Sequence, residues 1–576
     1  MTNLDPQTPP VTPAPAKETK AQKAERLKLE KNPWEAWEEV RQFAREGRAA
    51  VLPEWAEFYF KWWGVYTQGD GVGVTGGKDG VGKASDFFMM RLGVPNGLLT
   101  AHQLRVIGGL TQKYARNLAD ITTRQSIQLH WLTIESLPEI VAALTEIGLS
   151  PKGTCGDVVR NVTGCPLAGL DGHELVDASP LAVEIAQRLT ANPEYYNLPR
   201  KFKVTVSGCP VWCSYPEIND VALTAIKRGD EVGYTLRVGG GLSTEPHIAV
   251  RIPVFIPQSK AIEVVEAVLR IFKEQTNLRE NRTRARLKYL FMRHGWTAES
   301  MLAAIEEKLG YRLDPSPVSE DVIPDDVYRD HIGVTPQRQP GLSAIGASVL
   351  RGRLTGDQLI QLAEIAEQFG DGHLRTTIMQ NIVIANVPNA RTREVIERLN
   401  QIGLRVEVSP FWRGAIACTG TEFCKLAITE TKGFARWLVS EMEDRLPAFD
   451  QQIRLHVTGC TNSCGQSWIA DIGLEGKKIK KDGAMVDAFY FCVGGAIGKY
   501  AGIARQIGFR AAAEDCPAAI ERLLRAYLAT RTPGEDLRAY FARTDDETLR
   551  AQLAGTVVAA VERDPPPAGG RHLVDA

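Results

Sequence analysis

The chain has 576 residues, of which 44% are hydrophobic and 24% charged, with 68 basic and 69 acidic side chains. At roughly 150 residues per domain this predicts a globular protein of three or four domains, and it excludes wholesale disorder, a collagen-like repeat and a small disulfide scaffold. The net charge of −1 gives no support to nucleic-acid binding, and no apolar run reaches the roughly 18 residues of a membrane span, so we expect a soluble protein.

Residues 1–30 are expected to form a disordered tail that leads into a helix. They are rich in Pro and Thr and then in Lys and Glu, a composition that buries too little apolar surface to fold alone. They contain no apolar signal-peptide segment and carry acidic residues that transit peptides usually lack. We therefore expect a cytoplasmic protein.

A glycine-rich stretch, GDGVGVTGGKDGVGK, follows at 69–83. It lacks the closing Gly-Lys-Ser/Thr of a phosphate-binding P-loop, and no Gly-x-Gly-x-x-Gly fingerprint follows a predicted strand. Neither a nucleotide site nor a flavin domain is indicated. We interpret the stretch as a mobile loop near the mouth of a binding site.

The rest of the chain contains two copies of one unit. Residues 97–149 align without a gap on 352–404, and 13 of these 53 positions are identical, where average composition gives roughly three by chance. Each copy predicts a turn, a helix, a strand and a second helix. The match resumes at an offset of 251 residues, where VTVSGCPVWC at 204–213 lies over LHVTGCTNSC at 455–464.

This duplication predicts an α+β, pseudo-twofold molecule with a site where the halves meet. Each copy is expected to consist of a smaller ferredoxin-like half-domain followed by a larger α/β lobe. The expected limits are 31–150 and 331–410 for the half-domains, with an N-terminal extension in the first, and 151–330 and 411–576 for the lobes.

Lys201 and Lys203 stand out in the first copy. They alternate with Phe202 in a predicted strand, so both side chains point to one face. Two like charges on one face are unfavourable unless anions or acidic groups lie opposite. The pair therefore indicates an anion site, although a single cation in such a segment is more often solvated or salt-bridged.

Four cysteines of the second copy fall in two close pairs, in CTGTEFC (Cys418 and Cys424) and in GCTNSCGQ (Cys460 and Cys464). Four thiolates suit a zinc ion or an iron–sulfur cluster. Zinc knuckles usually have gaps of two to four residues, whereas one gap here is five, which favours a cubane cluster. Zinc and plain buried cysteines remain the alternatives.

These two motifs resemble those of the ferredoxin-dependent nitrite and sulfite reductases, and the resemblance extends from about residue 55 to 540. It implies a 4Fe–4S cluster held by the four cysteines and coupled to a sirohaem, with Cys464 as the shared axial ligand of the haem iron. It further implies nitrite or sulfite as substrate. Because no dinucleotide fingerprint or flavin domain is evident, we expect electrons to come from a separate small carrier, reduced ferredoxin, and we expect a monomer.

The resemblance also assigns roles to cations of the first copy. Arg91, Arg160, Lys201 and Lys203 would surround the open face of the haem, bind substrate oxygens and relay protons, while Arg124 would lie nearer the haem carboxylates. Other polar residues beside the motifs are candidates for haem contacts or for ordering the cluster loop, against structural turn and ladder roles. They are Gln125, Gln128, Gln380, Thr419 and Asn462.

The first copy also contains a Cys-x-x-x-Cys, at Cys209 and Cys213. With Cys165 it suggests a second cluster site, but only three cysteines map there, because Cys155 lies ten residues away. The related enzymes carry no cluster in this half. We therefore favour a vestigial or structural role for the pair, and we expect Cys492 and Cys516 to be ordinary buried thiols.

The sequence features that bear on the substrate, nitrite or sulfite, point in different directions. GCTNSCGQ, with Gln466, is similar to the nitrite-reducing branch. Nitrite reductases of plant and cyanobacterial type usually have Asn where this chain has Lys203, and a second cation suits a dianion better than a monoanion. Tyr66 and Cys155 match a bacterial sulfite-reducing subgroup with a Tyr/Cys pair beside the haem, the alternative being core packing. Taken together, these features narrowly favour nitrite.

A run of lysines, GKKIKKDG at 476–483, predicts a basic hairpin tip that steers an acidic ferredoxin, with a solvated turn as the alternative.

Two other functional classes of protein compete with the reductase. One is a zinc-stabilised RNA-binding protein, whose basic balance is missing. The other is a redox-sensing cluster protein without haem, which would need no cation-rich site.

Overall fold

The computed structural model describes residues 18–68, 86–209, 213–321 and 329–556. The glycine-rich stretch at 69–83 and most of the expected tail lie outside these ranges. Of the tail, 20–30 form helix α1 (Lys20–Glu30), so the expectation of disorder is wrong for this part. The helix is stabilised by a capping box on Thr19 and by an apolar face, with Ala24 and Leu27, that packs against Trp62.

Two five-stranded sheets form the smaller half-domains. The first has the order β1-β2-β5-β4-β14 and the second β12-β13-β16-β15-β3. The strands of the first are β1 (Val65–Thr67), β2 (Phe88–Leu92), β5 (Ile127–Leu132), β4 (Ala119–Ile121) and β14 (Arg353–Leu354). Those of the second are β12 (Gly333–Pro336), β13 (Leu342–Ala347), β16 (Ile382–Pro388), β15 (His373–Thr376) and β3 (Leu98–Thr100).

The two half-domains exchange a strand. β14, from the second copy, pairs with β4 of the first sheet, and β3, from the first copy, pairs with β15 of the second. Neither sheet is therefore a continuous segment of sequence, which the expected limits at 31–150 and 331–410 did not foresee. Gly97 and Gly352, immediately before the exchanged strands, both have positive φ, and a Cβ on either would lie within 2.5 Å of a carbonyl oxygen of the other half.

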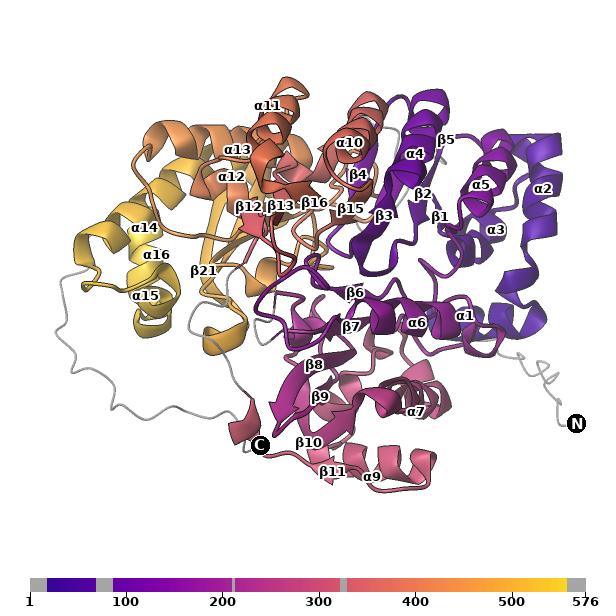
Figure 1. Ribbon diagram of the computed structural model, residues 1–576. Coiled ribbons are helices and arrows are strands. Elements are labelled where there is room, and N and C mark those ends of the chain that lie inside the picture. Colours follow the sequence, from indigo (N-terminus) through magenta and orange to yellow (C-terminus); the bar gives the residue numbers. More distant parts are fainter. Residues whose placement is uncertain (1–17, 69–85, 210–212, 322–328, 557–576) are drawn as a thin grey trace, which may run out of the picture.

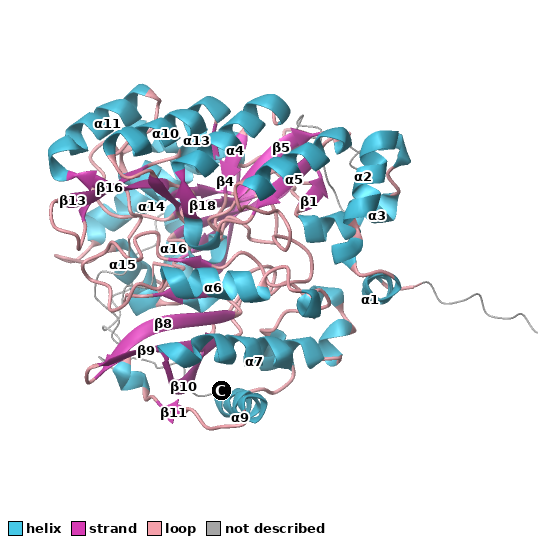
Figure 2. Cartoon of the chain, turned by 45° about the vertical axis from the view of Figure 1, so that its right-hand side comes forward, coloured by secondary structure: helices cyan, strands magenta, loops and turns pink. Residues whose placement is uncertain are grey.

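One hydrophobic core spans both half-domains and includes Leu104 and Ile107 of the first copy with Leu359 and Leu362 of the second. Helices of both copies lie side by side above the sheets (Figures 1 and 2). They are α4 (Ala101–Tyr114), α5 (Leu137–Glu146), α10 (Gly356–Phe369) and α11 (Thr392–Gln401). The duplication thus forms one structural unit, because its halves share a core.

Each larger lobe contains a sheet with three parallel strands followed by antiparallel ones, in the orders β11-β10-β9-β8-β7-β6 and β17-β18-β19-β20-β21. The first comprises β6 (Thr163–Gly164), β7 (Val204–Ser207), β8 (Val221–Arg228), β9 (Glu231–Val238), β10 (Val250–Pro257) and β11 (Asp314–Pro315). The second comprises β17 (Ala415–Ala417), β18 (Leu455–Thr458), β19 (Ile472–Lys481), β20 (Ala484–Val493) and β21 (Arg505–Ala512). The offset of 251 between β7 and β18 confirms the second repeat of the sequence.

Helices flank these sheets, and the first lobe forms the lower part of Figure 1. The helices of the first lobe are α6 (Ser179–Leu189), α7 (Ala261–Glu274), α8 (Tyr289–Arg293) and α9 (Ala298–Leu309). Those of the second are α12 (Pro410–Gly414), α13 (Lys432–Arg445), α14 (Cys516–Thr530), α15 (Leu537–Arg543) and α16 (Asp546–Ala554). The extension before β1 adds α2 (Trp37–Glu46) and α3 (Pro53–Glu57). None of the described helices is long and apolar enough to span a bilayer.

Candidate functional site

The cysteine loops of the second lobe meet because their strands are parallel neighbours. Cys418 follows β17, and Cys460 and Cys464 follow β18, so both loops leave the same edge of the sheet. The main-chain N–H of Gly459 donates to Sγ of Cys418 at 3.1 Å, and Nδ2 of Asn462 donates to Sγ of Cys460 at 3.5 Å. Backbone geometry therefore brings the two motifs together.

The four sulfur atoms are spread more widely than one ion requires. Zinc–sulfur bonds of about 2.3 Å would place thiolates within roughly 4.6 Å of one another. Within the described chain, no three of these four sulfur atoms lie mutually within 4.8 Å. This spacing suits a larger group. Burial raises the pKa of Cys424 to about 12 and that of Cys460 to about 11, so their ionisation requires a bound cation or cluster.

Cys464 is the exposed member of the set, and its main chain contacts the first copy. Its carbonyl oxygen accepts a hydrogen bond from Oγ1 of Thr123 at 3.3 Å. Thr123 belongs to the turn between β4 and β5, beside Arg124. This contact links the cluster loop to the cation-bearing half, and it was missed from the sequence because a lone threonine in a turn carries no signal.

Five cations of the first copy gather opposite Cys464, and we call them the cation group: Arg91, Arg124, Arg160, Lys201 and Lys203. Each interacts electrostatically with another member or with a shared neighbour, and Arg91 and Lys201 also interact with Cys464. A main-chain hydrogen bond of 2.8 Å from Arg160 to Phe202 brings the loop of the former beside the lysines. The structure therefore assembles cations that are up to 112 residues apart.

Hydrogen bonds to main-chain carbonyl oxygens hold two arginines of the cation group, Arg160 and Arg124, in position. Arg160 donates to the carbonyl oxygens of Thr154 and Gly156 at 2.8 to 3.2 Å. Arg124 donates to the carbonyl oxygens of Asn161 at 2.5 Å and Val204 at 3.3 Å and to Oδ1 of Asn219 at 2.9 Å, while its Nε is buried without a hydrogen-bond partner. Burial, together with the charge of Arg160, lowers the pKa of Arg124 to about 9. A buried, unpartnered guanidinium N–H indicates that an acceptor is missing.

The lysines are held by their main chain while their side chains remain unpaired. The N–H of Lys203 donates to Oδ2 of Asp220 at 2.8 Å, and Arg286 pairs with the same carboxylate at 2.8 Å. Among the described residues, no hydrogen bond or ion pair involves Nζ of Lys201 or Lys203. Burial lowers both pKa values, that of Lys201 to about 7, with Arg286 the next largest influence on the latter. Unpaired half-buried lysines at this point indicate an anion site.

Tyr66 and Cys155 meet beside Arg91. The guanidinium Nη1 of Arg91 lies 3.1 Å from Sγ of Cys155, and the hydroxyl of Tyr66 contacts the same sulfur. Burial raises the pKa of Tyr66, and the neighbouring Cys155 adds to the shift. The pair therefore contacts the cation group, and its role beside the haem remains a prediction.

Comparison with known proteins identifies the family. Residues 155–313 and 409–558 match the family described as the nitrite and sulphite reductase 4Fe-4S domain, and 81–147 and 335–402 match the nitrite/sulfite reductase ferredoxin-like half domain. The chain belongs to the nitrite and sulfite reductase family. The 4Fe–4S cluster and the sirohaem are therefore its expected cofactors, which confirms the cofactor prediction.

Individual relatives carry both substrate names. The assimilatory ferredoxin-dependent nitrite reductase of Haloferax mediterranei is 36% identical, over 87% of this chain and 88% of that protein. Sulfite reductase [ferredoxin] 1 of Mycolicibacterium paratuberculosis is also 36% identical, over 91% and 95%. A solved structure of Mycobacterium tuberculosis NirA protein has a TM-score of 0.86 at 34% identity, covering 92% of this chain and 97% of that one.

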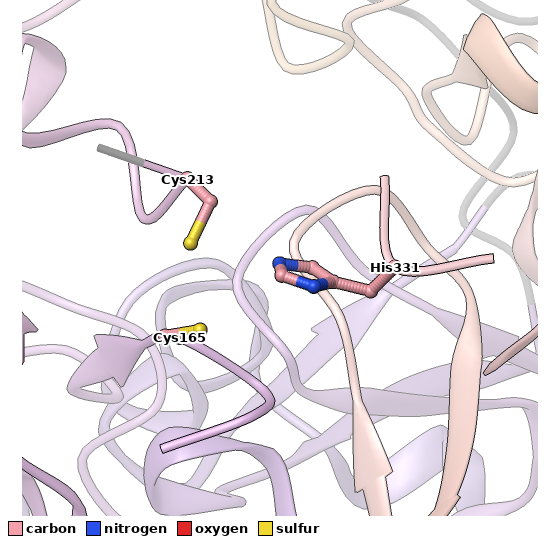
Figure 3. A group of neighbouring side chains, drawn as sticks. All are labelled: Cys165, Cys213 and His331. Carbon is pink, nitrogen blue, oxygen red and sulfur yellow. The ribbon is translucent and has the colours of Figure 1, made fainter. Parts of the chain in front are cut away.

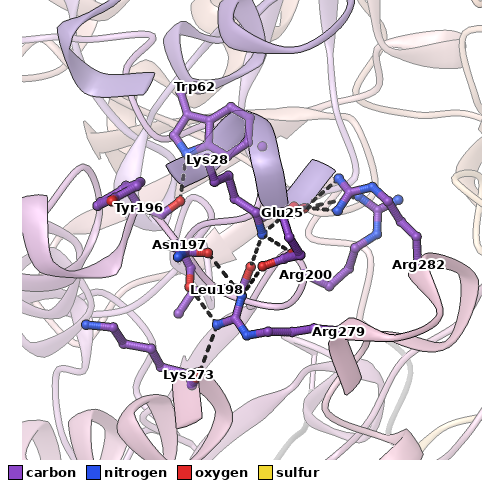
Figure 4. A network of polar contacts seen from close by, with 12 residues as sticks. Glu25, Lys28, Trp62, Tyr196, Asn197, Leu198, Arg200, Lys273, Arg279 and Arg282 are labelled. Atoms are coloured by element: carbon purple, nitrogen blue, oxygen red, sulfur yellow. Dashed lines mark hydrogen bonds and ion pairs between the residues drawn. The ribbon is translucent and has the colours of Figure 1, made fainter. Parts of the chain in front are cut away.

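A buried ion network lies in the loops that carry two members of the cation group, and Figure 4 shows the part of it around Lys28, Arg200 and Arg282. Asp157 is fully buried and pairs with Lys28 at 3.5 Å, Arg200 at 3.2 Å and Arg282 at 2.7 Å. It precedes Arg160 by three residues, and Arg200 directly precedes Lys201. The three cations lower the pKa of Asp157 against the opposing effect of burial. Helix α1 thus contributes, through Lys28, to the loops that carry the cation group.

Two predicted haem contacts have a structural role instead. Gln125 donates from Nε2 to the carbonyl of Thr376 at 2.9 Å and accepts from the N–H of Gly164 at 3.0 Å. Its counterpart Gln380 donates to Ile121 at 3.0 Å and accepts from Ala417 at 3.1 Å. Both amides join the halves, so the prediction of cofactor contacts is not supported for them.

The remaining polar residues predicted to contact the cofactors are Asn462, Gln128 and Thr419, and their surroundings differ. Asn462 contacts Sγ of Cys460, as described above. Gln128 is 5% exposed and lies opposite Arg91 in the β2–β5 pair. Thr419 is half-buried beside Cys418. For Gln128 and Thr419, cofactor contacts remain predictions.

The lysine run forms the end of the β19–β20 hairpin, as expected, but its charges are largely neutralised. Lys477 pairs with Glu475 at 3.1 Å, Lys478 pairs with Asp487, and Lys481 pairs with Asp515 at 2.9 Å. These contacts favour the alternative of a solvated turn. Docking of ferredoxin at this hairpin remains a prediction.

Proposed function

We propose that this chain reduces sulfite to sulfide with six electrons from reduced ferredoxin, at a sirohaem coupled to a 4Fe–4S cluster. The observation that carries the choice of substrate is the pair Lys201 and Lys203, whose Nζ atoms have no partner among the described residues. A second lysine attracts a dianion more strongly than a monoanion. This preference reverses the narrow one for nitrite drawn from the cluster loop.

Two neighbouring residues support the same choice. Tyr66 and Cys155, which match the sulfite-reducing subgroup, contact each other and Arg91 of the cation group. Gln466, which favours nitrite, belongs to the cluster loop, where its main-chain oxygen lies 3.1 Å from Nδ1 of His456. Residues that would contact the anion determine which anion binds more directly than residues of the cluster loop, such as Gln466.

The residues present fit the cofactors of the family. Cys418, Cys424, Cys460 and Cys464 would hold the cluster, with Cys464 shared with the sirohaem iron. Together the two cofactors supply the electron-transfer chemistry. Sirohaem carries eight carboxylates, and the unpartnered Nε of Arg124 offers a buried donor for one of them.

The cation group has separable tasks in this scheme. Arg91 and Arg160 would bind oxygens of the anion, since guanidinium groups match planar oxygen recognition. Lys203 would add the second positive charge. Lys201, with a pKa near 7, would hold a proton at neutral pH and release it to an oxygen of the anion.

A paired kinetic assay tests the proposal. With purified holoenzyme and reduced ferredoxin, kcat/KM for sulfite should exceed that for nitrite. Lys203→Asn should shift the ratio toward nitrite by at least about tenfold, whereas Lys203→Arg, which keeps the charge, should preserve most of it. A larger kcat/KM for nitrite in the unsubstituted enzyme would instead establish nitrite as substrate. Turnover of neither anion with sirohaem bound would reject both.

A further inference from the structure

A second group of side chains that could bind a metal lies where the first lobe meets the segment entering the second half, apart from the cysteines of the second copy. One ligand atom each from Cys165, Cys213 and His331 lies within 4.8 Å of the others, and the imidazole is turned toward the two sulfur atoms (Figure 3). The side chain of Cys209 contacts both thiols. Two thiols and one imidazole thus converge on a single point, with the third thiol, that of Cys209, beside them.

This group is enclosed and largely apolar. Cys165 is 4% exposed, and Cys209 and Cys213 are each 2% exposed. They share a hydrophobic cluster with residues of both halves, among them Leu167 and Val383. Nε2 of His331 is buried without a hydrogen-bond partner. A buried, unsatisfied ring nitrogen costs about 1–3 kcal/mol, and thiols are weak hydrogen-bonding groups, so the arrangement is unfavourable unless a ligand satisfies it.

Three separate chain segments deliver these donors. Cys165 follows β6 and Cys209 follows β7, and the two strands are parallel neighbours, so their loops leave the sheet together. His331 comes from the segment that leads from the first lobe into β12. The sequence signal was incomplete because this fourth donor lies 118 residues beyond Cys213, outside any spacing motif.

The position of His331 is fixed by contacts on both sides. Its φ is +60°, an uncommon value for a residue other than glycine. Arg413 of the second lobe forms a two-bond ion pair with Asp330, with both N–O distances 2.7 Å. A Cβ at Gly346 would lie 1.6 Å from the carbonyl oxygen of His331, so glycine is required there. The strained backbone is therefore held in place, as is common for ligands.

We propose that Cys165, Cys209, Cys213 and His331 bind one zinc ion, which fastens the segment entering the second half onto the first lobe. Three thiolates and one imidazole form a common structural zinc set. Binding exchanges three thiol protons, released to solvent, for three zinc–sulfur bonds, and no electrons are transferred. The mutual distances below 4.8 Å among Cys165, Cys213 and His331 suit one ion, and Cys209, which contacts both thiols, is the nearest candidate for the fourth ligand.

Metal analysis of the holoenzyme tests this site independently of the reductase activity. Protein grown with zinc and washed with a chelator should retain one zinc per chain in addition to its iron. His331→Ala and Cys213→Ser should each lower zinc by at least about tenfold, because loss of a ligand weakens binding strongly. Sirohaem absorbance and iron content should stay unchanged. Cys492→Ser, at a buried thiol outside the group, is the matched control and should retain zinc.

X-ray absorption at the zinc edge on the unsubstituted holoenzyme keeps the proposal testable if the variants fail to fold. It should give three sulfur neighbours at about 2.3 Å and one nitrogen at about 2.0–2.1 Å. The proposal would be overturned if the washed holoenzyme contained no zinc. It would also be overturned if the zinc were surrounded by oxygen and nitrogen only, which means an adventitious ion only, or if both variants retained zinc as well as the unsubstituted enzyme.

Discussion

The loop after β7 and the loop after β18 are the same structural element used for two purposes. In each, a Gly-Cys pair follows the strand and a second cysteine comes four residues after the first. In each, a hydroxyl at the strand end donates to the carbonyl of the first cysteine, from Ser207 at 3.2 Å and from Thr458 at 3.4 Å. The loop itself therefore does not decide which group is bound.

The partners of the loop make the difference. In the second lobe, as the structure describes it, no three of the four cysteine sulfurs lie mutually within 4.8 Å, which leaves room for a cluster, and Cys464 is exposed. In the first lobe, the equivalent Cys213 is buried beside Cys165 and His331 within 4.8 Å. A duplicated donor loop thus acquires its chemistry from the segments that it faces.

The largest expected effect comes from exchanging the second cysteine of either loop for serine. Cys464→Ser should reduce turnover to the assay background, because the proposed link between cluster and haem is lost. Cys213→Ser should leave iron and sirohaem in place and remove only the zinc. Iron, zinc and the absorption spectrum of each purified variant measure the contrast.

Equal loss of sirohaem from both variants would contradict the assignment of different groups to the two loops. Cys516→Ser serves as the control, since that buried thiol lies on α14, outside both loops.

The next effect concerns Lys201, whose position in the second copy is occupied by Gln452. Lys201→Met should lower kcat by about 10²–10⁴-fold, the usual contribution of a positioned proton donor. In the unsubstituted enzyme the required form is protonated, so kcat should fall as pH rises above about 7. A bound anion favours the charged lysine and moves this fall to higher pH.

The groups facing Lys201 are Arg160, Arg200, Arg286 and Cys464, and substitution at Lys201 alone separates its titration from theirs. Lys201→Arg keeps the positive charge but does not deprotonate in this range, so its kcat should be low and independent of pH. A pH profile for Lys201→Arg identical to that of the unsubstituted enzyme would assign the proton transfer to another residue.

The sequence was sufficient for the parts of the molecule that local spacing encodes. Residues 97–149 over 352–404 predicted the paired half-domains, and the two cysteine motifs predicted the cluster loops. Lys201 and Lys203 were recognised by their alternation with Phe202, although they lie just before β7 and not in the strand that was predicted. In each case the information lies within a few residues or in a repeat that the letters reproduce.

The sequence was insufficient where contacts join distant segments. β3 pairs with β15 and β14 with β4, each in the sheet of the other copy. Because the two copies have similar sequences, pairing within a copy and pairing between copies could not be told apart from the sequence. Gln125 has the same neighbours in the chain whether its amide contacts a haem or the other half. His331 follows a segment with no motif, and only folding brings it to Cys165. Such contacts depend on tertiary packing, which local patterns do not encode.

A smaller effect is expected from the aspartates that hold equivalent strands. Asp220 accepts from the N–H of Lys203 at 2.8 Å and Asp471 from that of Arg454 at 2.6 Å. Asp220→Asn and Asp471→Asn should each destabilise the protein by about 3–5 kcal/mol, because each breaks a buried ion pair, that of Asp220 with Arg286 at 2.8 Å and that of Asp471 with Arg538 at 3.4 Å. Only Asp220→Asn should also lower kcat, by about tenfold, since it disturbs Lys203.

Thermal unfolding and steady-state kinetics on the two variants separate stability from positioning. If Asp471→Asn lowered kcat as much as Asp220→Asn at equal cofactor content, the carboxylate at 220 would have no special role in placing the lysine.

The smallest expected effect tests the symmetry of the two halves through Gln125 and Gln380. Each amide donates to a carbonyl and accepts from an N–H of a neighbouring segment, so Gln125→Leu and Gln380→Leu both leave buried main-chain groups unsatisfied. Each should cost about 1–3 kcal/mol of stability, measured by chemical denaturation against Gln361→Leu on the exposed face of α10. Sirohaem content should be the same in all three, because neither buried amide is free to reach a cofactor. Loss of sirohaem from Gln125→Leu alone would show that the two positions have diverged, with the first-copy glutamine serving the haem as well as the junction.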